Sequence, residues 1–86
     1  MELERVLKAL ANKRRLAIVK YLRRTKQATV GDIAEILKLS FKATSKHLGV
    51  LFNAEIVDKE QRSLNMYYRL SYRQHPVAKQ ISNSLE

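Results

Sequence analysis

Apolar residues recur at helical spacing in five stretches of the chain. The predicted helices span residues 2–11, 13–24, 30–37, 41–54 and 76–85. In the first stretch, Leu3, Val6, Leu7 and Leu10 share one face, which is typical of an amphipathic helix. Capping residues support three of these boundaries. The residues just before the second, third and fourth predicted helices can accept a hydrogen bond from the first helical turn, and they are Asn12, Thr29 and Ser40.

Two strand-like segments follow the fourth predicted helix. They span residues 56–62 and 66–71, and the second alternates apolar and polar positions. Ser63-Leu64-Asn65 separates them, so the pattern predicts a hairpin in which Asn65 takes the left-handed conformation. Residues 25–29 are polar and are predicted to form a loop.

The order of these elements predicts a fold. A short helix joined by about three residues to a longer one forms a helix-turn-helix, and a hairpin directly after it makes the arrangement winged. We expect a single domain over residues 1–86 of the mostly α (α+β) class, with five helices and a two-stranded wing. The helix-turn-helix would span residues 30–54 and the wing residues 56–71.

Composition narrows the possible partners. The 86 residues include no cysteine, so neither disulfides nor thiolate metal sites contribute. Seventeen Lys and Arg against eight Asp and Glu give a net charge of +9, which points to nucleic acid or another anionic partner. No apolar run approaches the ~20 residues of a membrane span, and residues 1–20 lack the pattern of a signal peptide. We expect a cytoplasmic protein; Leu85-Glu86 is compatible with a vector-derived end.

The outward face of the fourth predicted helix is the strongest functional signal. Lys42, Ser45, Lys46, Gly49 and Asn53 share this face, and small polar and cationic groups on a protruding helix can enter a major groove. Gly49 costs roughly 0.5–1 kcal/mol relative to alanine, which a close approach to DNA or to another helix would justify. An ordinary solvated face is the alternative, but the short helix before it and the hairpin after it favour DNA.

Two further basic regions are candidates for phosphate contact. Arg62, beside the hairpin tip, can reach a minor groove or a phosphate, although a solvated turn is an equal alternative. Residues 1–26 hold nine basic and two acidic side chains, a net charge of +7, which either grips phosphates or forms a solvated face. Arg14 and Arg15 oppose the dipole of their own helix unless an anion lies nearby, and we expect Arg15 to contact DNA.

Catalysis and metal binding have little support. Ser45 and His47 lie two residues apart on a helix and point away from each other, so no triad is expected. His47 is predicted to be half-buried and bonded to backbone, and His75 to be a cap or a surface residue. We predict no enzyme activity, no cofactor and no metal.

Apolar stripes at both chain ends predict a homodimer, because so small a monomer can hardly cover both. The predicted dimer seam comprises Leu3, Leu7, Leu10, Val77, Ile81 and Leu85.

Three segments together resemble the ArsR/SmtB group of winged-helix repressors. They are LKALANKRRLAIV (residues 7–19), IAEILKLSFKATSKHLGVL (residues 33–51) and MYYRLS (residues 66–71), and the resemblance covers roughly residues 5–72. It implies a homodimer on a pseudo-palindromic operator, with the first and last helices at the dimer interface and the fourth in the major groove. By the same resemblance Ser40, Lys42, Ser45 and Lys46 face DNA, and Arg62 to Asn65 form the wing tip.

The sequence departs from this group in three places. The cysteines that its metal sensors carry at the third helix are absent, where Thr29 to Asp32 stand instead, so metal sensing is not expected. Lys38 and Glu55 occupy positions where the group often has glycine, which predicts strained backbone. The alternatives to an operator-binding repressor are an interaction module that binds protein or RNA and a non-specific architectural DNA-binding protein.

Overall fold

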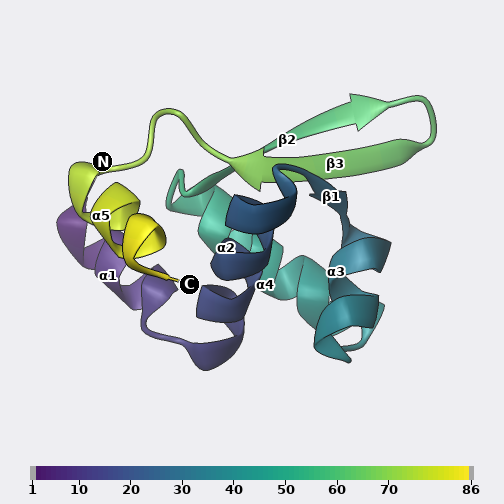
Figure 1. Ribbon diagram of the computed structural model, residues 1–86, viewed down its shortest axis with the longest axis horizontal. Coiled ribbons are helices and arrows are strands. Elements are labelled where there is room, and N and C mark those ends of the chain that lie inside the picture. The colour runs from purple at the N-terminus through teal and green to yellow at the C-terminus, as the bar shows by residue number, and fades with distance from the viewer. Residues whose placement is uncertain (1, 86) are drawn as a thin grey trace.

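The computed structural model describes residues 2–85, so Glu86 and the question of a vector-derived end lie outside the described residues. It contains five helices and three strands (Figure 1). In chain order they are α1 (Leu3–Leu10), α2 (Lys13–Thr25), β1 (Ala28–Thr29), α3 (Val30–Leu37), α4 (Phe41–Asn53), β2 (Val57–Arg62), β3 (Asn65–Leu70) and α5 (Pro76–Ser84). The winged helix-turn-helix prediction is confirmed, and the five predicted helices are present with boundaries that agree to within two residues.

The helices begin where capping side chains were expected. Asn12 Oδ1 accepts hydrogen bonds from the backbone N–H groups of Arg14 (3.0 Å) and Arg15 (3.1 Å). Thr29 and Asp32 form a reciprocal capping box at the start of α3, and the Ser40 hydroxyl accepts from the backbone of α4. These bonds satisfy N–H groups that a helix leaves without partners.

The sheet has three strands rather than two, so the predicted loop over residues 25–29 is wrong at its end. Ala28 and Thr29 pair with Tyr68 and Tyr67 of β3, which gives the antiparallel order β1-β3-β2. A two-residue strand is too short to show alternation, and its partner lies far along the chain.

The hairpin turn also differs from its prediction. Arg62 pairs with Asn65, which leaves a two-residue turn of Ser63 and Leu64. Ser63 has the left-handed backbone, with φ of 58°, and Asn65 does not.

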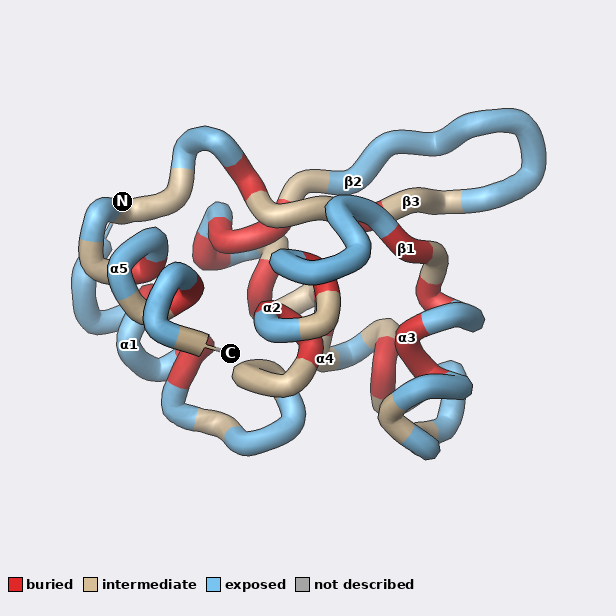
Figure 2. Tube along the Cα trace, viewed as in Figure 1, coloured by how far each residue is buried: buried red, intermediate tan, exposed pale blue. Residues whose placement is uncertain are grey.

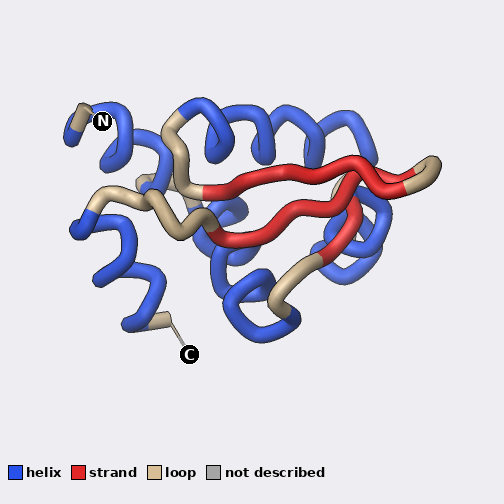
Figure 3. The backbone as a smooth tube through the Cα atoms, turned by 90° about the horizontal axis from the view of Figure 1, so that it is seen from above, coloured by secondary structure: helices blue, strands red, loops and turns tan. Residues whose placement is uncertain are grey.

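The core lies between α2, α4 and the base of the sheet. Its largest fully buried side chains are Ile18, Leu22, Ile33, Leu48, Leu51 and Ile56. Figure 2 shows that the outer half of the hairpin extends beyond this core and is exposed. Figure 3 shows α4 along one side of the molecule and the end of α2 on the other, with the strands running between them. None of the described helices is long and apolar enough to cross a membrane.

Candidate nucleic-acid interface

The packing of α4 determines which of its side chains point outward. Thr44, Leu48 and Leu51 are fully buried, and the Thr44 hydroxyl donates to the Ser40 carbonyl at 2.8 Å. The opposite side carries the predicted DNA-facing residues: Lys42, Ser45, Lys46, Gly49 and Asn53. Both lysines and Asn53 are exposed, whereas Ser45 and Gly49 are half-buried. The structure therefore brings these five residues to one surface, which we call the outer face of α4.

Gly49 has open space in front of it. Apart from its chain neighbours and the backbone of its own helix, a Cβ atom built on Gly49 meets no heavy atom of the described chain within 4 Å, and its backbone is not left-handed. Neither local packing nor backbone conformation therefore requires glycine here. Within residues 2–85, no other helix closely approaches Gly49, so the structure itself offers no packing partner that would explain the glycine.

The wing holds Arg62 in a defined position. The guanidinium lies 4.4 Å from the centre of the Tyr67 ring, donates to Gln27, and lies 3.6 Å from a Glu60 carboxylate oxygen. Leu64 at the tip is 94% exposed. The wing therefore projects an apolar tip with a cation stacked directly behind it.

Arg15 connects three helices instead of facing outward. Its guanidinium donates to the carbonyls of Ala9 (2.6 Å) and Lys8 (3.2 Å) in α1, and to His47 Nδ1 (3.3 Å) in α4. The prediction that His47 bonds to the backbone is therefore wrong, since its hydrogen-bond partner in the structure is this guanidinium. Burial lowers the pKa of His47 below its ordinary value, and the positive charges of Arg15, Arg14 and Lys46 lower it further.

The position of Arg15 on α2 explains why its side chain points inward. Arg15 precedes Ile18, Val19 and Leu22 by three, four and seven residues, so it shares the face that packs on the core. Its neighbour Arg14 lies one position further round the helix, toward solvent, and is exposed.

Half of the six cations of α2 share one exposed side of that helix. The exposed residues Lys13, Lys20 and Arg24 recur at i, i+7 and i+11, which places them on one side of the helix. Figure 3 shows the C-terminal end of α2, which carries Lys20 and Arg24, on the other side of the molecule from α4.

The two predicted apolar stripes have unequal exposure. In α1, Leu3 is 44% and Leu7 is 45% exposed, whereas Leu10 is buried in the core of its own chain. Near the C-terminus, Val77, Ile81 and Leu85 are half-buried, and Ile81 and Leu85 pack against that core. Leu3 and Leu7 are therefore the residues of this set most open to a partner.

The comparisons with known proteins agree with this geometry. Residues 12–59 match the model of the bacterial regulatory protein, arsR family. The chain belongs to the arsR family. This is a family of transcriptional regulators, not of enzymes, and its DNA-binding winged helix-turn-helix is the fold described above, so the resemblance inferred from the sequence is confirmed.

Individual relatives extend the match beyond these residues. The arsenical resistance operon repressor of Bacillus subtilis (strain 168) is 34% identical over 68 residues, which cover 79% of this chain and 65% of that protein. Reduced HlyU from Vibrio cholerae superposes with a TM-score of 0.80 at 31% identity, covering 93% of this chain and 80% of the other. The homodimeric winged helix-turn-helix DNA-binding domain of a possible ArsR-family regulator from Mycobacterium bovis gives 0.80 at 28% identity, over 93% and 70%.

Two departures from the arsR pattern have structural consequences. Lys38 and Glu55 have left-handed backbones with φ of 57° and 58°, which confirms the strain predicted for them. Lys38 is the C-cap of α3, and Glu55 follows the C-cap of α4; glycine adopts this conformation at such positions without penalty. Within residues 2–85, no three His, Cys, Asp or Glu side chains lie close enough together to hold a metal ion.

Proposed function

We propose that this arsR-family chain is a homodimeric repressor that acts in the cytoplasm and occupies a pseudo-palindromic DNA operator. One observation carries the proposal: α4 buries one face completely and offers small polar groups, two lysines and an unobstructed glycine on the other. A helix with a slim, cationic outer face fits a major groove, because bulky side chains would keep it away from the base edges.

Each proposed contact has a distinct role. Lys42, Ser45 and Lys46 contact base edges or the adjoining phosphates, and Gly49 permits the close approach. Ser40, at the exposed start of α4, lies where backbone N–H groups and the helix dipole favour a phosphate. From the wing, Arg62 and Asn65 reach the minor groove or its phosphates. Arg15 is not included, because its guanidinium already holds α1 and α4.

The proposed dimer presents two copies of α4 to successive major grooves. Its seam combines Leu3 and Leu7 of α1 with Val77, Ile81 and Leu85 of the C-terminal segment, while Leu10 supports the seam from within each protomer. The homodimeric relative from Mycobacterium bovis supports this arrangement. Light scattering should therefore give the mass of a dimer at micromolar concentration, and a monomer would contradict the proposal.

Charge removal on α4 tests the DNA contacts. We expect Lys42→Ala plus Lys46→Ala to weaken binding to a selected duplex roughly ten- to thirtyfold near physiological salt, and to flatten the slope of log K against log[salt] by about one to two. The matched control is Lys20→Ala plus Arg24→Ala, which removes the same charge from the other side of the molecule. Equal losses for the two variants would mean that only net charge matters, and unchanged binding by the α4 variant would exclude this helix as the reader.

A further inference from the structure

One groove on the surface has no role in the function proposed above. It runs between α2 and α3 as two hollows of about 370 and 180 Å³, both lined by Ala17 and Leu37. Tyr21 and Ile36 complete its apolar floor. We call this surface the α2–α3 groove.

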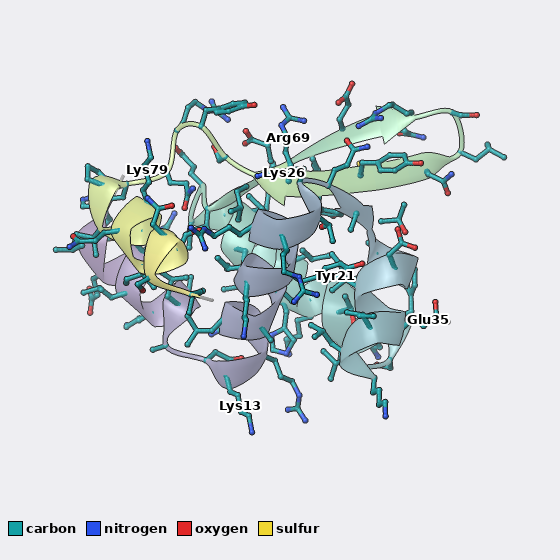
Figure 4. The ribbon with its side chains drawn as sticks, in the orientation of Figure 1. Lys13, Tyr21, Lys26, Glu35, Arg69 and Lys79 are labelled. Carbon is teal, nitrogen blue, oxygen red and sulfur yellow. The ribbon has the colours of Figure 1, made fainter. Side chains whose placement is uncertain are left out.

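The floor of the groove is open to solvent. Ile36 is 55% exposed, although it is a large apolar side chain. Figure 4 shows Tyr21 extending from α2 toward α3, so its ring spans the space between the two helices. Adjacent apolar groups left uncovered in this way favour a partner that brings apolar groups of its own.

The rim of the groove is strongly basic. Four cations line it, and they are Lys13, Arg14, Lys20 and Arg24. No carboxylate lines either hollow, and none of these four takes part in an ion pair within residues 2–85. Their charges are therefore free to meet those of an acidic partner.

We propose that the α2–α3 groove docks an acidic amphipathic helix of a protein partner. Apolar side chains of that helix would cover Ala17, Tyr21, Ile36 and Leu37, and its flanking carboxylates would face the four cations. From Lys13 to Arg24 the groove is about 17 Å long, which is roughly three turns of a helix. Nucleic acid would satisfy the cations but not the exposed isoleucine, so the observations favour protein.

A defined peptide pair tests the chemistry. The first is a fluorescent synthetic helix of about 15 residues, with leucines at i, i+3, i+4 and i+7 and glutamates at most other positions. The second keeps every glutamate and replaces each leucine with serine. By fluorescence anisotropy on the full chain, we expect the leucine peptide to bind at least about tenfold more tightly. Equal binding of the two peptides would overturn the proposal, because charge alone would then explain the interaction.

Paired variants separate the groove from the DNA-binding surface. Lys20→Ala plus Arg24→Ala should weaken the leucine peptide at least about fivefold and leave duplex affinity within about threefold. Lys42→Ala plus Lys46→Ala should do the reverse, and Ile36→Ser should weaken the peptide without changing duplex binding. This proposal therefore fails or survives independently of the operator-binding function.

Three outcomes would show that the groove does not dock an acidic helix. If Lys20→Ala plus Arg24→Ala binds the peptide as tightly as the native chain, the peptide does not use the groove. If that variant loses duplex affinity as strongly as the α4 variant, the rim is a nucleic-acid surface. If Ile36→Ser changes the oligomeric mass in light scattering, the groove contacts a second copy of this chain. Each of these results overturns the proposal.

Discussion

Replacing Gly49 with alanine should stabilise the protein and weaken DNA binding at the same time. The residue lies in the interior of α4, where glycine costs about 0.5–1 kcal/mol relative to alanine. Apart from its chain neighbours and the backbone of its own helix, the added methyl group meets no described heavy atom within 4 Å, and the backbone there is not left-handed, so neither a clash nor strain offsets the gain.

The size of both effects follows from this geometry. For a domain of this length, a gain of about 0.5–1 kcal/mol raises the melting temperature by about 2–8 °C. The same methyl group protrudes into the space that DNA would occupy. We expect duplex affinity to fall at least about threefold, equivalent to roughly 0.7 kcal/mol.

Two measurements on one preparation check this prediction. Thermal unfolding followed by circular dichroism reports the stability, and anisotropy of a labelled duplex reports the affinity. Gly31→Ala is the matched control, because its Cβ would lie 3.8 Å from Thr29 Oγ1 in ordinary contact and outside the proposed contacts. A stabilised Gly49→Ala protein with undiminished duplex affinity would refute the close approach, and a destabilised one would refute the open space.

Three further predictions concern the supports of α4. Arg15→Ala should lower the free energy of unfolding by about 1–3 kcal/mol, because two backbone carbonyls and His47 lose their hydrogen-bond donor. The control Arg14→Ala should change it by less than about 0.5 kcal/mol, and urea titrations of the two variants measure the difference. The pKa of His47 in the folded chain lies below its unfolded value of about 6.5, so the unfolded chain binds more protons. The free energy of unfolding should therefore fall as pH drops below about 6.5. A His47→Gln protein with the same pH dependence would contradict this prediction. Lys38→Gly and Glu55→Gly should each raise the free energy of unfolding by up to about 1 kcal/mol, because glycine adopts a left-handed backbone without strain. A loss of stability in chemical denaturation would show that the interactions of these side chains outweigh the strain.

Helices were predictable from the sequence because their signals are local. Asn12, Thr29 and Ser40 each mark a helix start through a bond to a residue two or three positions away. The strand β1 was not predictable, since Ala28 acquires its partner Tyr68 only when the chain folds back on itself. The hairpin was predictable, but which residue takes the left-handed backbone at its turn depended on the register.

The outer face of α4 was predictable for the same reason as the helices. Its residues follow from periodicity, and burial of Leu48 and Leu51 places that face outward. Periodicity also contained the information that Arg15 points inward, but adjacency to Arg14 suggested a shared role. The position of the basic charge was beyond prediction, because composition counts basic residues without showing that the C-terminal end of α2 lies across the molecule from α4.

Selection of bound duplexes from a random pool tests the central claim most directly, namely that a symmetric dimer reads DNA through α4. The account predicts enrichment of an inverted repeat whose half-sites lie about one helical turn, roughly 34–36 Å, or a multiple of it apart. The Lys42→Ala plus Lys46→Ala protein should lose that enrichment, and the Lys20→Ala plus Arg24→Ala protein should keep it. Tight binding with no enriched sequence, or enrichment of a single asymmetric site, would contradict the account.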